Sequence, residues 1–190
     1  GAIGVLLLTV FAAFRLYDLL APEAAFALII VLVAGGALLA VLQDTAALAV
    51  LAFIGGYLAP VLISTGSGDH VALFSYYAVL NLAVLGVAWF RPWRALNLVG
   101  FLFTFVIGAA WGAKYYRPEL FYSVEPFLVG FFLFYLAIPL FYALRTREQS
   151  RGFVDSTLVF GTPLLAFPLQ AALLVDDRMG LAWSALLVSA

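Results

Sequence analysis

Long apolar runs separated by short polar stretches make up almost the whole chain. Two short runs, residues 1–14 and 179–190, lie at the ends. Six runs approach or reach the length of about 20 residues that a helix needs to cross ~30 Å of hydrocarbon. They cover residues 24–42, 46–64, 71–90, 95–112, 127–144 and 156–175. We therefore expect an all-α fold, a polytopic transmembrane helical bundle of about six full spans plus two partial end segments.

The end runs indicate that residues 1–190 form a single transmembrane helical region, a window of a larger polytopic protein. The chain begins without Met, and residues 1–14 lack the basic region and cleavage site of a signal peptide. We interpret this run as the tail of a helix that starts outside the sequence. The expected partners are the lipid bilayer and the remaining helices of the same or a partner membrane protein.

Composition supports a membrane protein and excludes several chemistries. The 190 residues are 66% hydrophobic and 10% charged, whereas soluble domains carry about 25% charged residues. A net charge of -1 provides no basic face, so nucleic acid is not an expected partner. The absence of Cys and the presence of a single His argue against a metal site. No cofactor is expected.

Every charged residue lies between the apolar runs. Charges inside a span are the usual mark of proton relays and ion-coupled transport, so their absence disfavours a proton pump or a carboxylate-coupled transporter. Sites built from backbone carbonyls at broken helices stay open, because they need no charged side chain.

The stretch IGGYLAPVLISTGSGDHVALFSYY, residues 54–77, contains the strongest local break signal. Gly55 and Gly56 allow a neighbouring helix to come close. Pro60 lacks a backbone N–H and crowds the carbonyl of Gly56, which then needs another donor in hydrocarbon. We predict a kink or break of the second span near Gly56–Pro60.

A polar run follows this break and contains the only histidine. One interpretation is a broken helix that faces a polar pocket; the other is an ordinary turn whose side chains cap the next helix. The candidate polar residues are Ser64, Thr65, Ser67, Asp69 and His70.

Small residues recur every fourth position along residues 95–112. They are Gly100, Thr104, Gly108 and Gly112. Such a ridge lets another helix approach closely, and we predict helix packing on this face; a permeation groove is the alternative. Asn81 and Gln170 lie within spans, and we expect them, like Thr104, to hydrogen-bond to a neighbouring helix or to contact a ligand.

The connection at residues 114–126 mixes aromatic and charged side chains. They are Lys114, Tyr115, Tyr116, Arg117, Glu119, Phe121, Tyr122 and Glu125. The segment could hold a lipid headgroup or an anionic polymer, or it could simply anchor the chain at the membrane interface. Glu125 before Pro126 is also typical of a helix start.

If the polar run is a working site, His70 should line a water-accessible cavity. Asp69, Tyr76 or Tyr77 should then lie within reach, and a polar group from residues 117–125 should approach from the same side, because two spans separate the two connections. Established catalytic patterns do not support an enzyme. Ser67, Asp69 and His70 are triad residue types, but neighbours in sequence rarely have triad geometry, and no GxSxG motif or phosphate-binding Gly-Lys motif occurs.

Three segments resemble a family of bacterial predicted membrane proteins, domain of unknown function 2339. They read GGYLAPVLISTGSGDHVALFSYYAVLNLAVLGVAWF, WRALNLVGFLFTFVIGAAWG and YYRPELFYSVEPFL. The resemblance implies a long, many-helix protein of the bacterial inner (cytoplasmic) membrane, and it brings no established activity or catalytic residues. It marks as family-pattern positions Gly55, Gly56, Pro60, Ser64, Thr65, Gly66, His70, Tyr76, Asn81, Arg117, Pro118, Glu119, Glu125 and Pro126.

The sequence leaves two functions open. The first is a non-enzymatic module for transport, permeation or the scaffolding of an envelope complex. The second is a membrane-embedded enzyme that acts on a lipid or polyprenyl-linked substrate, with the region of Asp69 and His70 converging on residues 117–125. An enzyme needs titratable groups that meet in one cavity, and a scaffold does not.

Overall fold

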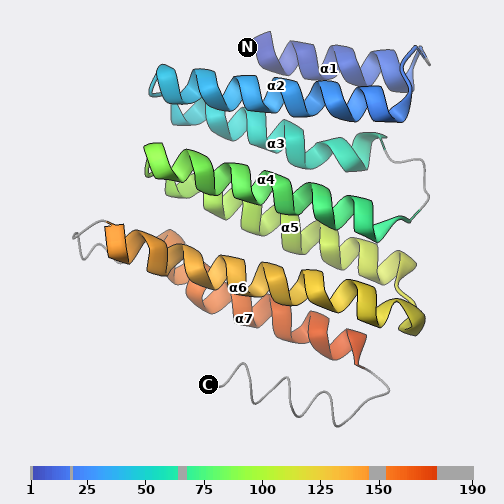
Figure 1. The fold of residues 1–190 in the computed structure, drawn as a ribbon, viewed down its shortest axis with the longest axis vertical. Helices are drawn as coiled ribbons and strands as arrows, with labels where there is room; N and C mark the ends of the chain where they lie inside the picture. The colour runs from blue at the N-terminus through green and yellow to red at the C-terminus, as the bar shows by residue number, and fades with distance from the viewer. Residues whose placement is uncertain (1, 18, 64–67, 146–152, 175–190) are drawn as a thin grey trace. The chain divides into compact units, whose positions relative to one another are not determined.

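In the computed structural model, helices form nearly all of the described residues, which are 2–17, 19–63, 68–145 and 153–174. Within these ranges there is no strand, so the expected all-α fold is confirmed (Figure 1). The helices in chain order are α1 (Ala2–Arg15), α2 (Pro22–Leu42), α3 (Ala46–Ile63), α4 (His70–Phe90), α5 (Arg94–Tyr115), the 3-10 turn η1 (Pro118–Leu120), α6 (Phe121–Arg145) and α7 (Phe153–Leu173).

Five of the described helices are long and apolar enough to cross a membrane, which is close to the six that the sequence predicts. They are Ala24–Leu42, His70–Phe90, Arg94–Tyr115, Pro118–Leu140 and Val154–Leu173. The remaining expected span, in α3, is a shorter apolar helix over Ala46–Leu62. The run at residues 179–190 lies outside the described residues.

The chain divides into two compact units. Unit 1 comprises Gly1–Asp69 and Ser75–Gly100, and unit 2 comprises His70–Phe74 and Phe101–Ala190. In unit 1, α1, α2 and α3 pack against one another, and in unit 2, α6 and α7 lie side by side (Figure 1).

Gly55 and Gly56 admit close neighbours in unit 1. A Cβ atom on Gly56 would lie 2.9 Å from Cγ2 of Val33, and one on Gly55 would collide with the Leu7 side chain. Real Cβ atoms avoid such separations. The end of the flexible Leu7 side chain can turn away from a residue larger than Gly55, but the β-branched Val33 side chain is stiff. Gly56 therefore limits how closely α2 and α3 approach.

Of the predicted kink or break near Pro60, the kink stays a prediction, and the break is wrong, because α3 continues through Pro60 to Ile63. The reason lies on the next helix. The hydroxyl of Tyr76 in α4 donates a 2.8 Å hydrogen bond to the carbonyl of Gly56, which is the group that Pro60 deprives of its helical donor. Since that carbonyl is satisfied by protein, the helix does not need to open toward water.

A buried polar cluster also ties α3 to α4 within unit 1. The Tyr57 hydroxyl donates to Oδ1 of Asn81 at 2.6 Å, and the Tyr77 hydroxyl donates to the Tyr57 carbonyl at 3.0 Å. All three side chains are almost fully buried. The helix-to-helix hydrogen bond expected for Asn81 is therefore present. Tyr76 and Tyr77 both donate hydrogen bonds to backbone carbonyls of α3.

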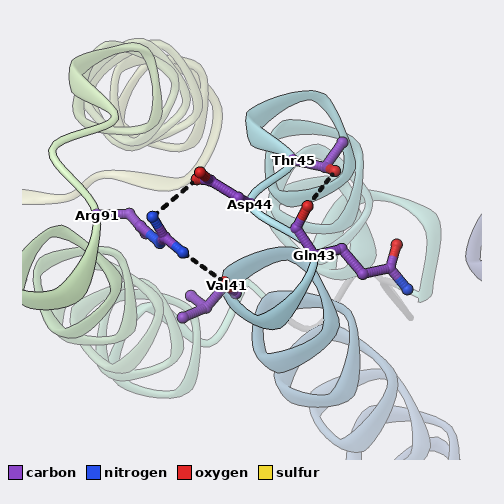
Figure 2. Close-up of polar contacts among 5 residues, drawn as sticks. All are labelled: Val41, Gln43, Asp44, Thr45 and Arg91. Atoms are coloured by element: carbon purple, nitrogen blue, oxygen red, sulfur yellow. Dashed lines mark hydrogen bonds and ion pairs between the residues drawn. The ribbon is translucent and has the colours of Figure 1, made fainter.

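Arg91, just after α4, contacts the turn between α2 and α3 in the same unit (Figure 2). Its Nη1 lies 3.1 Å from Oδ1 of Asp44, and its Nη2 donates to the carbonyl of Val41 at 3.4 Å. The second bond adds a donor to a carbonyl in the last turn of α2, which also accepts a 3.4 Å hydrogen bond from the backbone N–H of Asp44. With both charged side chains partly exposed, the ion pair itself contributes less than about 1 kcal/mol.

The connection between the fourth and fifth expected spans is shorter than the sequence predicts. α5 continues to Tyr115 and α6 begins at Phe121, directly after η1. Glu125 thus lies inside α6 rather than at its start. Pro126 is tolerated there because it deprives only the carbonyl of Tyr122 of a donor, and Tyr122 is 87% exposed.

Candidate functional site

Unit 2 contains a cavity of about 300 Å³. It lies among α5, α6, α7 and the first turn of α4, and its volume is at the lower end of the range for ligand pockets. Its lining consists of aromatic, aliphatic and small residues: Phe74, Thr104, Phe105, Gly108, Ala109, Trp111, Gly112, Ala113, Tyr116, Val124, Phe127, Leu128, Phe131, Leu169, Ala172 and Leu173.

The small-residue ridge of α5 creates this cavity. A Cβ atom on Gly108 would meet its nearest neighbour, the Phe74 ring, only at 3.9 Å, and one on Gly112 would meet nothing within 4 Å. The predicted close packing of a helix is therefore wrong at these two glycines. Aromatic rings face the ridge, and the space of the missing side chains stays open. Thr104 also lines the cavity, whereas Gly100 belongs to unit 1.

The described lining has no charged side chain. Its two hydroxyl groups are both engaged: Thr104 Oγ1 lies 3.2 Å from the Tyr135 hydroxyl, and the Tyr116 hydroxyl donates to the Leu173 carbonyl at 2.9 Å. The bond expected from Thr104 to a neighbouring helix is present. The wall therefore favours an apolar occupant.

The cavity follows the second half of α5. At about 1.5 Å per residue, the stretch from Thr104 to Tyr115 is ~17 Å long. This length is close to one leaflet, or half of a hydrocarbon core ~30 Å thick. The Thr104 end thus lies deep within the span, and the Tyr115 end lies at the end of the helix.

His70 lies beside the cavity wall rather than in it. Its ring centroid is 5.2 Å from that of Trp111 and 6.4 Å from that of Phe74, and both of these rings line the cavity. Its Nε2 lies 2.8 Å from Oγ of Ser123. The Ser123 hydroxyl in turn donates to the Leu120 carbonyl at 2.9 Å. His70 is not among the residues that line this cavity, and the expectation that it lines a water-accessible cavity stays a prediction.

The structure brings together only part of the predicted polar site. A group from residues 117–125 does approach His70, but it is Ser123. Arg117 and Glu119 are exposed, as is Asp69. Glu125 accepts a 3.0 Å hydrogen bond from Gln170 of α7, which is the helix-to-helix bond expected for that amide. Three further candidates lie outside the described residues: Ser64, Thr65 and Ser67.

Sequence reasoning missed Ser123, and a signal for it exists. It is the only serine or threonine in residues 114–126. It is therefore the one short hydroxyl side chain in that segment available to a histidine. The partners Tyr57 and Tyr135 had no comparable signal, because tyrosines are spread through the apolar runs.

Comparison with protein families settles the class of this chain. The family model described as predicted membrane protein (DUF2339) matches residues 1–190. The chain belongs to the DUF2339 family. A search of curated proteins and a search of solved structures each found no match.

Membership of DUF2339 and the five candidate spans together give the setting of the site. The apolar helices of this DUF2339 protein lie in a lipid bilayer. All four helices around the cavity, α4, α5, α6 and α7, contribute to it from within candidate spans.

Proposed function

We propose that this DUF2339 protein is a non-enzymatic membrane module that holds the hydrocarbon chain of a lipid in the unit 2 cavity. The observation that carries the proposal is the lining: aromatic and small apolar residues, with no charge among the described residues. Binding of this kind serves transport of the lipid or its presentation to an envelope complex. In line with the family resemblance, we place it in the inner membrane of a bacterium.

Size and setting support a lipid chain as the occupant. A cavity of about 300 Å³ is at the lower end of the volume range for ligand pockets, which suits part of one lipid chain. Water is a poor occupant, because an ordered water needs two to four polar partners and both lining hydroxyls are already bonded. A chain from one leaflet also matches the depth of the cavity.

An enzyme acting on a lipid or polyprenyl-linked substrate is the second candidate. The observation in its favour is the pair of His70 and Ser123 behind the Trp111 ring. An enzyme needs several titratable groups that converge on one reacting position. Arg117 and Glu119 are exposed instead, so a binding role is the better supported of the two.

Trp111 provides a direct test, because it lines the cavity and is only 6% exposed. The chain has four tryptophans, so replacing Trp89, Trp93 and Trp183 with Phe leaves Trp111 as the single reporter. In liposomes of phosphatidylcholine with brominated acyl chains, we expect strong quenching of its fluorescence, because the chain enters the cavity.

The matched control keeps Trp89 as the single tryptophan. Trp89 is 57% exposed at the end of α4, so bulk lipid reaches it without any cavity. Quenching of Trp111 comparable to that of Trp89 supports the proposal. If brominated chains quench Trp89 and leave Trp111 bright, the cavity holds no lipid chain and the proposed function fails.

A further inference from the structure

Selection among lipids requires more than the apolar cavity. Lipid tails are as apolar as the side chains of the wall, so a tail that moves from the bilayer into the cavity gains little from the hydrophobic effect. Any preference for one lipid must come from a polar contact near the end of the cavity. This inference rests on the proposed function and concerns the headgroup of the bound lipid.

The pair of His70 and Ser123 is placed for such a contact. His70 is the first residue of α4 and packs on Trp111, which lies in the last turns of α5. Both therefore lie at the helix-end side of the cavity, the depth at which tails meet headgroups. The deep end, around Thr104, offers a hydroxyl that is bonded to Tyr135.

Hydrogen counting assigns the tautomer of His70. Ser123 has one hydroxyl hydrogen, and it goes to the carbonyl of Leu120. With that hydrogen on the carbonyl, the 2.8 Å contact between Ser123 Oγ and His70 Nε2 is a hydrogen bond only when Nε2 carries the imidazole N–H. In the neutral ring, Nδ1 then carries a lone pair, and it has no hydrogen-bond partner in the described part of the chain.

We propose that Nδ1 of His70 accepts a hydrogen bond from a hydroxyl group in the headgroup of the lipid whose chain fills the cavity. Ser123 is a positioning residue, since it holds the ring in the tautomer that leaves Nδ1 as an acceptor. Two membrane sources carry this chemistry: an anionic phospholipid with a glycerol headgroup, and a neutral diacylglycerol with its free hydroxyl.

The protein with Trp111 as its single tryptophan tests the preference in phosphatidylcholine liposomes. Four brominated probes are added in increasing mole fraction: phosphatidylglycerol, diacylglycerol, phosphatidylethanol and phosphatidylcholine. Phosphatidylethanol has the charge of phosphatidylglycerol but no headgroup hydroxyl. We expect one or both of the hydroxyl-bearing probes to reach half-quenching at a mole fraction about five- to tenfold lower than that of phosphatidylethanol. A difference of this size corresponds to the net contribution of one hydrogen bond to binding.

Variants of the pair separate the inference from the proposed function. His70→Phe keeps a ring against Trp111 and removes the acceptor, so the headgroup preference should disappear while quenching by bromine persists. Ser123→Ala should weaken the preference, and Ser123→Thr, which keeps the hydroxyl, should retain it.

Each outcome has one meaning. Equal half-quenching by all four probes, or a preference that survives His70→Phe, overturns the role of His70 and leaves the lipid-binding cavity intact. A preference for both anionic probes over both neutral ones would assign selection to charge and likewise overturn it. Failure of every probe to quench Trp111 would instead remove the proposed function itself.

Discussion

Replacing Gly112 with leucine should expel the lipid chain from unit 2. A side chain at this position meets no atom within 4 Å of its Cβ, so leucine enters the cavity without a collision and occupies the space of the ligand. We expect the mole fraction of brominated lipid that half-quenches Trp111 to rise by about tenfold, equivalent to ~1.4 kcal/mol.

Gly130→Leu is the matched control for this substitution. Gly130 lies in α6 within the same unit, is exposed, also has nothing within 4 Å of its Cβ, and does not line the cavity. Both variants gain about the same helix propensity, near 1 kcal/mol, from the loss of a glycine. Equal loss of quenching in the two variants would show that cavity filling is not the cause.

Replacing Gly56 with leucine should destabilise unit 1 strongly. A Cβ atom there already lies 2.9 Å from Val33 Cγ2 and 3.6 Å from Leu80 Cδ1, and leucine adds three more carbons. Overpacking of this kind costs about 1–3 kcal/mol, and we expect the upper end because two helices face the site. The readout is the midpoint of denaturation in mixed micelles with increasing sodium dodecyl sulfate.

Gly35→Leu in α2 controls for the loss of a helical glycine. Gly35 is exposed, and a Cβ atom at this position would meet nothing within 4 Å, so leucine at this site should leave the midpoint unchanged or raise it. Similar midpoints for the two variants would mean that Gly56 does not set the approach of α2 and α4 to α3.

The fold was largely predictable because a membrane-spanning helix can be recognised from a long run of apolar residues. In lipid, every backbone group must be bonded inside the segment, so an apolar run of sufficient length has few alternatives to a helix. Polar residues such as Asp44 and Arg91 mark the turns between these apolar runs. The sequence does not indicate that these two residues form an ion pair with each other.

The errors arise where a property of one residue depends on a distant one. Pro60 signals a missing bond, but whether the helix breaks depends on Tyr76 of the next helix, whose hydroxyl replaces the lost donor. Gly108 and Gly112 indicate a helix face without side chains, but the sequence does not say whether a neighbouring helix or a cavity occupies the space beside it. Periodicity describes one helix at a time, and both outcomes depend on its neighbours.

The sequence predicted His70, which lies beside the cavity, but not the cavity itself. His70 stood out as the single histidine, and a polar partner from residues 117–125 followed from the topology of alternating spans. The identity of that partner depends on side-chain direction at the start of α6, where Ser123 faces His70 while Arg117 and Glu119 are exposed. The sequence therefore identified the segment that contacts His70, but it favoured the charged residues of that segment rather than Ser123.

A structure of the complete protein in lipid nanodiscs tests the lipid-binding cavity most directly. We predict elongated, unbranched density along Gly108 and Gly112, bounded by the rings of Phe127 and Phe131 and continuing toward Trp111. A cavity closed by those rings against the two glycines, or one that holds discrete waters in place of a chain, would contradict the proposal.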